Sequence, residues 1–164
     1  MSWTCHVLDV TGATKAHNRV TSNFIGELRQ RLDLDVWNVM AADMAVEIGN
    51  QVRFPDLVVE PLNAPGSPLV AEHACLLVEI LSPSSVGRDM RIKASEYTSL
   101  PDLHTYVVAS QEEPRLWVWQ RQGGLAGAFP AEPLEITGRD QELTVTAFGF
   151  ALPMAGLYRG VGDR

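Results

Sequence analysis

The chain has 164 residues, of which 46% are apolar and 20% charged, a composition typical of a soluble globular protein. We expect one domain spanning residues 1–164, large enough to bury a hydrophobic core. No apolar run approaches the roughly 18 residues that a membrane-spanning helix needs, and residues 1–6 lack the pattern of a signal peptide. Cys5 and Cys75 are too few for a disulfide framework, so a reducing, cytoplasmic location is the expectation.

The net charge of −7 argues against a general nucleic-acid-binding protein, because such proteins usually carry a basic stripe. It does not exclude a nuclease. Carboxylates that hold a metal ion are themselves negative, and only one face of a nuclease has to contact DNA. The charge does lower the expectation of tight, non-specific binding to duplex DNA.

The first half of the chain predicts a short strand, one helix and then several strands. Residues 5–10 resemble a strand, and apolar residues over 15–32 recur at helical spacing. Thr14 is placed to cap that helix. Short β-prone runs follow at residues 36–40, 44–48, 52–54 and 57–59. Gly49-Asn50 predicts a turn, and the proline-rich residues 61–68 predict a loop.

The second half begins with a nearly unbroken apolar run at residues 74–81, typical of a central strand covered by helices on both faces of its sheet. A helix is predicted from Asp89 to about Leu100, ended by Pro101. Two further strands, at 104–110 and 115–121, should form a hairpin. Short strands near 132–136 and 143–146 and a terminal turn at 153–158 complete the prediction.

Two carboxylates lie at the edges of these apolar runs. Asp56 follows Pro55, and proline sits only at the start or edge of a strand, so Asp56 should open the strand at 57–59. Glu79 interrupts the apolar run at 74–81. Ionised carboxylates are rarely buried without a partner or a metal. Glu79 is therefore an exposed strand-end acid, a member of a buried ion pair, or a ligand that shares a metal with Asp56. Mg²⁺ (or Mn²⁺) suits the last arrangement, because Mg²⁺ takes one or two carboxylates and keeps several waters.

Lys93 is the candidate cation for this site. It lies four residues after Asp89 and four before Tyr97, so the three residues share a helix face. Lys93 could form a surface pair with Asp89, which would contribute little. It could instead reach back to the strand carboxylates and stabilise a phosphate or an attacking water. Asp89 and Tyr97 are predicted to serve as a helix cap and a helix-packing residue.

Other chemistry has less support in the sequence. The histidines show no metal-ligand spacing and are expected to be surface or capping residues: His6, His17, His73 and His104. Neither a Gly-x-Ser-x-Gly nucleophile motif nor a phosphate-binding glycine loop is present. Trp117 and Trp119 alternate along a predicted strand, which favours packing in the core or in a dimer over stacking on bases.

At the same residues, the chain resembles the Uma-two family of restriction-endonuclease-like proteins, which belongs to the PD-(D/E)XK nuclease superfamily. The resemblance covers roughly residues 7–160. The matching segments are 11–20, 42–46, 54–59, 77–85, 100–108 and 113–119, together with the spaced residues Asp89, Lys93 and Tyr97.

This resemblance implies a restriction-endonuclease-like α/β (α+β) fold, with a mixed β-sheet core flanked by helices. It implies an active site of Asp56, Glu79 and Lys93, in which the two acids bind the metal. The superfamily's lysine usually lies two residues after the glutamate, a place that Leu81 occupies here. Lys93 on the following helix would then supply the amine. Members of such families are commonly homodimers.

The resemblance also shows one departure. Members usually begin with a Tyr-Glu segment and an Asp-Gly-Glu turn whose glutamate can join the site. Here His6 falls at the position of that glutamate, and the upstream segment is missing. Either the natural start lies upstream or the site is trimmed and impaired, and His6 could itself contact the metal or phosphate.

The leading hypothesis is a magnesium-dependent endonuclease that hydrolyses DNA phosphodiester bonds with a metal-activated water. The alternative is a catalytically inactive nuclease-fold protein that acts as a dimeric binding or assembly module. The acidic charge and the missing upstream segment favour the alternative.

Overall fold

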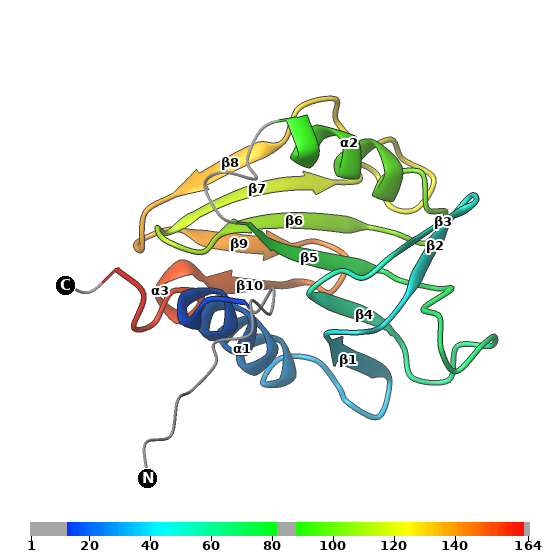
Figure 1. The fold of residues 1–164 in the computed structure, drawn as a ribbon, viewed down its shortest axis with the longest axis horizontal. Coiled ribbons are helices and arrows are strands. Elements are labelled where there is room, and N and C mark those ends of the chain that lie inside the picture. The colour runs from blue at the N-terminus through cyan, green and yellow to red at the C-terminus, as the bar shows by residue number, and fades with distance from the viewer. Residues whose placement is uncertain (1–12, 82–87, 163–164) are drawn as a thin grey trace, which may run out of the picture.

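The computed structural model describes residues 13–81 and 88–162, in which a six-stranded sheet lies between two helical layers (Figure 1). The expected strand at 5–10 and His6 lie outside the described residues. In chain order the elements are α1 (Lys15–Arg29), β1 (Trp37–Ala41), β2 (Val46–Ile48), β3 (Gln51–Arg53), β4 (Leu57–Pro61), β5 (Leu76–Leu81), α2 (Arg88–Tyr97), β6 (Thr105–Ser110), β7 (Arg115–Gln120), β8 (Leu134–Thr137), β9 (Glu142–Val145), β10 (Phe150–Pro153) and α3 (Met154–Leu157).

The main sheet is mixed, as expected. Its strand order is β1-β4-β5-β6-β7-β8. Strands β5 and β6 are parallel, whereas β4 runs antiparallel to β5, and β7 runs antiparallel to β6. A parallel pair needs a crossover connection, and α2 forms part of the connection between β5 and β6. Two smaller hairpin sheets, β2–β3 and β9–β10, accompany the main sheet.

Strand β5 is buried at all six positions, which confirms the expectation of a central strand covered on both faces. Alternate side chains of a strand point to opposite faces of the sheet. Leu76, Val78 and Ile80 accordingly pack in the core beneath α1 and α3. Leu77 and Leu81 pack in the core beneath α2. The same alternation directs Glu79 toward α2.

Helix α1 forms where the helical spacing predicted it, and its start is capped as expected. The Thr14 hydroxyl accepts a hydrogen bond from the His17 backbone N–H at 3.0 Å, which satisfies one of the unpaired donors of the first turn. The same hydroxyl donates to the side-chain oxygen of Gln111 at 2.8 Å. Since the Gln111 N–H in turn donates to the Leu81 carbonyl, the start of α1 is tied to the end of β5.

Both long helices end earlier than their apolar spacing suggested. Helix α1 ends at Arg29 rather than residue 32, although Leu32 still packs on the core. Helix α2 ends at Tyr97 rather than Leu100, and a tighter turn continues the chain. Apolar periodicity predicts which residues face the core, and a turn after the helix can keep the same residues buried.

The C-terminal part is more regular than predicted. The expected terminal turn at 153–158 is preceded by strand β10, which pairs with β9, and it contains the short helix α3. Trp117 and Trp119 are buried in the core beneath α2, which confirms the prediction that they pack in the core. None of the helices in residues 13–81 and 88–162 is long and apolar enough to cross a membrane.

Burial of β5 predicts a sharp difference between two leucine substitutions. Leu77 is fully buried, whereas Leu69 is 75% exposed in a loop. Replacing Leu77 by alanine should cost about 2–5 kcal/mol of unfolding free energy, and Leu69→Ala should change it by less than about 0.5 kcal/mol. Urea unfolding of both variants measures the two values, and similar costs would contradict this account of the core.

Candidate functional site

Strand pairing brings Asp56 beside the middle of β5. Strands β4 and β5 pair with Leu57 opposite Val78. Asp56 directly precedes Leu57, the first residue of β4. Its Oδ2 accepts a hydrogen bond from the Ile80 backbone N–H at 2.7 Å. The side chain thus continues the hydrogen bonding of the sheet where β4 has not yet begun. This fixes one carboxylate oxygen and confirms that Asp56 opens its strand.

The other Asp56 oxygen contacts α1. His17 Nε2 lies 3.0 Å from Asp56 Oδ1, and the two side chains are only 19% and 24% exposed. His17 is the third residue of α1, in the turn that Thr14 caps. The expectation that His17 is merely a surface or capping histidine is therefore wrong. Nothing in the sequence indicated the contact of His17 with Asp56, because only the tertiary fold brings the first turn of α1 to the start of β4.

Glu79 is the most enclosed acid of the site, at 5% exposure. Lys93 Nζ lies 3.1 Å from its Oε2, and the Tyr97 hydroxyl donates to its Oε1 at 2.9 Å. Both donors come from one face of α2, as the spacing of four residues predicted. Tyr97 is thus more than the helix-packing residue expected, because its buried hydroxyl binds the carboxylate directly.

Burial raises the pKa of the Glu79 carboxyl above its ordinary value, since it disfavours the charged form. The Lys93 charge and the hydrogen bonds from Lys93 and Tyr97 oppose this shift, whereas the charge of Asp56 adds to it. Burial and the adjacent Glu79 likewise raise the pKa of the Tyr97 hydroxyl, so Tyr97 remains a proton donor. Two acids share the site, and their mutual repulsion favours a cation between them.

A second ion pair holds α2 next to the site residues. The Arg53 guanidinium, from β3, makes two hydrogen bonds of 2.9 Å to the carboxylate of Glu96. Two-pronged pairs of this kind fix orientation as well as distance. Because Glu96 precedes Tyr97, this pair fixes the β2–β3 hairpin against the segment of α2 that carries Lys93 and Tyr97.

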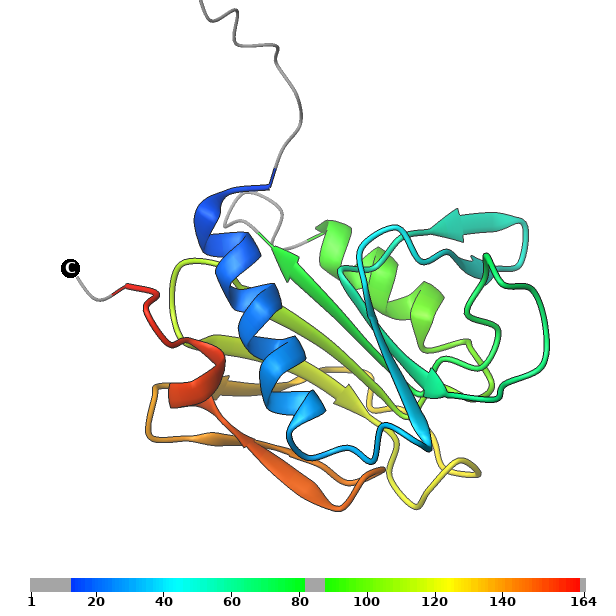
Figure 2. The ribbon, with the colours of Figure 1, turned by 90° about the horizontal axis from the view of Figure 1, so that it is seen from below.

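The site elements meet at one end of the molecule. Figures 1 and 2 show α1 and α2 on opposite faces of the sheet, and in Figure 2 the first turns of both helices lie toward the carboxyl end of β5. The structure brings together all three residues predicted for the site, Asp56, Glu79 and Lys93. Leu81, at the usual place of the superfamily's lysine, is buried in the core beneath α2. The side chain of Asp89 and all of His6 lie outside the described residues.

Of the alternatives for Glu79, an exposed acid is wrong and a buried ion pair with Lys93 is present. Whether a metal also binds there stays a prediction. Among residues 13–81 and 90–162, no cluster of three or more His, Cys, Asp and Glu side chains is arranged to hold a metal ion. A metal here would have to rest on two carboxylates, with water or phosphate supplying the remaining ligands.

Comparison with known proteins decides the family. The model of the Uma2 family, described as “Putative restriction endonuclease”, matches residues 6–155. The chain belongs to the Uma2 family. An “Uncharacterized protein sll1609” of Synechocystis is 27% identical over 122 residues, which cover 71% of this chain and 69% of the relative. This membership confirms the resemblance carried by the motifs.

A solved structure supports the same conclusion for the fold. The crystal structure of “a putative nuclease belonging to DUF820” from Anabaena variabilis superposes with a TM-score of 0.70. The match covers 88% of this Uma2 chain and 81% of that protein, at 14% sequence identity. At that identity the likeness establishes the fold alone. It confirms a mixed-sheet α+β architecture shared with a nuclease-like protein.

The raised pKa of Glu79 predicts a pH-dependent penalty on folding. Between the ordinary value of 4.5 and the higher folded value, the folded state holds a proton that the unfolded state has released. Stability therefore falls as pH rises through this window. Glu79→Gln has no such proton. Urea unfolding in EDTA would measure the unfolding free energies of the wild type and of Glu79→Gln at each pH. The wild-type value minus the variant value should fall from pH 4.5 toward neutrality. A constant or rising difference would contradict the assignment.

Tyr97→Phe tests the hydrogen bond to the buried carboxylate. Hydrogen bonds to charged groups contribute about 1.5–3 kcal/mol, and neutral ones about 0.5–1.5 kcal/mol. Tyr158 is the matched control, since its buried hydroxyl donates to the Arg115 carbonyl at 2.7 Å. At pH 7 the loss of unfolding free energy should be larger for Tyr97→Phe than for Tyr158→Phe. Equal losses would show that Glu79 carries no charge there.

Proposed function

We propose that this Uma2 protein is a Mg²⁺- or Mn²⁺-dependent endonuclease that hydrolyses phosphodiester bonds in DNA. The observation that carries the proposal is a nearly buried carboxylate, Glu79, held by Lys93 and Tyr97 beside a second carboxylate, Asp56. Burying an acid next to another acid opposes stability. Carboxyl groups whose pKa is shifted by such surroundings are typical of functional sites. Family membership and the nuclease-like fold support the same proposal.

The donor atoms suit a hard divalent cation. Among the described residues, the Ile80 N–H donates to one Asp56 oxygen and His17 Nε2 lies 3.0 Å from the other, whereas Lys93 and Tyr97 donate to the two oxygens of Glu79. A carboxylate oxygen has two lone pairs, so the contacts made by the described residues still allow each oxygen to bind a metal. Mg²⁺ is commonly bound by one or two carboxylates together with water and phosphate oxygens. Asp56 and Glu79 would hold the ion.

Bound there, the metal would lower the pKa of a water and stabilise charge that develops on the phosphate. The chain's own residues provide orientation. Ile80 and His17 fix the two oxygens of Asp56, and Tyr97 fixes one oxygen of Glu79. Lys93 is the group suited to meet the phosphate, since its ammonium already lies at the carboxylate and a phosphate oxygen is an equally good acceptor.

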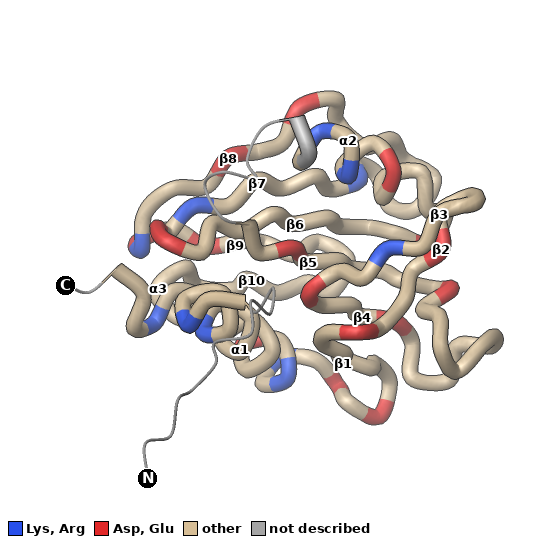
Figure 3. The backbone as a smooth tube through the Cα atoms, in the orientation of Figure 1, with Lys and Arg blue, Asp and Glu red and all other residues tan. Residues whose placement is uncertain are grey.

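Charge distribution fits a substrate that approaches from the helical end. Figure 3 marks Lys and Arg positions along the backbone of α1 and α2, and Asp and Glu positions around β1 and β4. The acidic balance of −7 would keep non-specific duplex binding weak and make binding depend on the metal. We also propose a homodimer as the active form, on the strength of the family resemblance.

A second function is favoured by one observation. With its ion pair to Lys93, Glu79 is already compensated, so the fold does not require a metal. In that case the protein would be an inactive nuclease-fold module that binds or assembles without cutting DNA.

A cleavage assay separates the two functions. Supercoiled, branched and single-stranded DNA would be incubated with the protein and Mg²⁺ or Mn²⁺. The proposal predicts cutting that EDTA abolishes and that Asp56→Asn, Glu79→Gln or Lys93→Met slows at least about a hundredfold, close to 2.7 kcal/mol of barrier.

Arg159→Met is the matched control, because Arg159 is exposed after α3 and lies outside α1 and α2, and it should cut as fast as the wild type. Each variant's fold would be checked by circular dichroism. Absence of cutting of every substrate by the wild type would favour the inactive module. Cutting that survives Glu79→Gln would place the chemistry elsewhere.

A further inference from the structure

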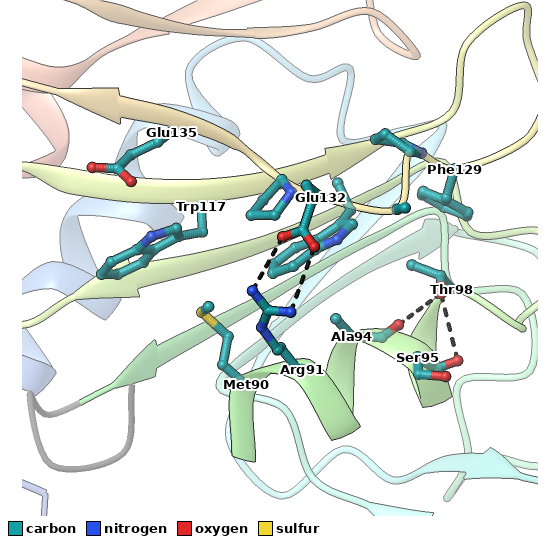
Figure 4. Close-up of a pocket in the computed structure, with 13 residues that line it drawn as sticks. Met90, Arg91, Ala94, Ser95, Thr98, Trp117, Phe129, Glu132 and Glu135 are labelled. Atoms are coloured by element: carbon teal, nitrogen blue, oxygen red, sulfur yellow. Dashed lines mark hydrogen bonds and ion pairs between the residues drawn. The ribbon is translucent and has the colours of Figure 1, made fainter. Parts of the chain in front are cut away.

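A second feature of α2 lies on the side facing β7 and β8, away from the ion pair with Arg53. A pocket of about 570 Å³ opens between α2, β7 and the segment 129–135 (Figure 4). Ligand pockets commonly have volumes of about 300–1,000 Å³. Its lining includes Trp117, Trp119 and Phe129, and from α2 it includes Arg91 and Ser95. The pocket and the candidate site therefore share one helix.

The inner wall of the pocket is aromatic. Trp117 and Trp119 are 8% and 3% exposed and form part of the core, so they offer a rigid apolar wall. Phe129 is only partly buried, and the Arg121 guanidinium carbon lies 4.6 Å from the centre of its ring. Because Arg121 covers one face of Phe129, a flat ligand can stack only on the other. Aromatic rings of this kind accept nucleobases without regard to sequence.

The charged residues of the lining are one cation, Arg91, and two anions, Glu132 and Glu135, of which Glu135 is paired with Arg115 on β7. Arg91 from α2 and Glu132 from the opposite segment face each other there, with Arg91 nitrogens 3.4–3.5 Å from the Glu132 oxygens (Figure 4). Their side chains are 71% and 69% exposed, and exposed pairs at such distances contribute little. A ligand that offers a partner to each of them can therefore separate them.

We infer that this pocket binds a nucleobase with an exocyclic amino group, carried on a nucleotide whose phosphate meets Arg91. The base would lie against Phe129 and the tryptophans, and Glu132 would accept from the amino group, as carboxylates do from cytosine N4. A nucleotide presents both an anion and an amine donor, so it offers one partner to Arg91 and one to Glu132 once the two side chains have separated. In the proposed nuclease the source is a base of the substrate strand, and this part of the inference rests on the proposed function.

Binding can be measured without catalysis. Calorimetric titrations in EDTA would use dCMP and dTMP, two pyrimidine nucleotides of which only dCMP carries an amino group. Oligonucleotides of deoxycytidine and of thymidine form the second arm. All titrations would be repeated with Glu47→Gln, a change at an exposed acid on β2 outside both sites, which should bind as the wild type does; because EDTA removes the metal, the result does not depend on the proposed cutting. Binding by the oligonucleotide alone identifies a strand as the source, and equal binding by dCMP identifies a free nucleotide.

Two substitutions on α2 make a matched pair. Ser95 is exposed and lines the pocket, and Ile92 is 45% exposed on the same helix outside the lining. Ser95→Trp should fill the pocket and lower the affinity for deoxycytidine at least about tenfold, and Ile92→Trp should leave it unchanged. Phe129→Ala should also weaken binding by about tenfold or more, and it keeps the test decisive if Ser95→Trp unfolds.

Three results would overturn the inference. The first is the absence of saturable binding by every probe. The second is binding that Ser95→Trp and Phe129→Ala leave intact in folded protein, which would place the bases elsewhere. The third is equal affinity for the deoxycytidine and thymidine probes, which would remove the role of Glu132.

Discussion

The carboxylate of Glu79 lies on a strand that is buried at every position, and its charge there must be compensated for the sheet to form. Lys93 and Tyr97 provide that compensation from α2. Removing one partner of a buried ion pair commonly costs about 3–5 kcal/mol, whereas replacing the whole pair by apolar residues is often neutral. Stability alone therefore gives little reason to keep both charges. Their presence fits the chemistry proposed for this site.

This one interaction orders the elements around it. It positions α2 on β5, and Arg53 and Glu96 connect the same helix to the β2–β3 hairpin. On the other side, Asp56 links the start of β4 to β5 through Ile80 and to α1 through His17. Helices on opposite faces of the sheet thus contribute to one polar site. A substitution of His17 in α1 can therefore alter the carboxylate of Asp56, which lies just before β4.

The sequence was informative wherever local chemistry decided the outcome. Pro55 marked Asp56 as the opening of a strand, and a charge within an apolar run singled out Glu79. Residues spaced by four placed Lys93 and Tyr97 on one face, and Thr14 was recognisable as a cap. The contacts of His17 and Arg53 were not predicted, because their partners lie 39 and 43 positions away along the chain. Only the packing of α1 and of the β2–β3 hairpin brings these partners close. The helix ends were misplaced because turns after each helix bury the same apolar residues.

The claim that two carboxylates form a metal site is tested most directly by calorimetric titration of the metal-free protein with Mn²⁺. The account predicts saturable binding that Glu79→Gln and Asp56→Asn each abolish or weaken strongly, and that Glu47→Gln, a change at an exposed acid on β2, leaves intact. Absence of binding to the wild type, or equal binding to all four proteins, would contradict it.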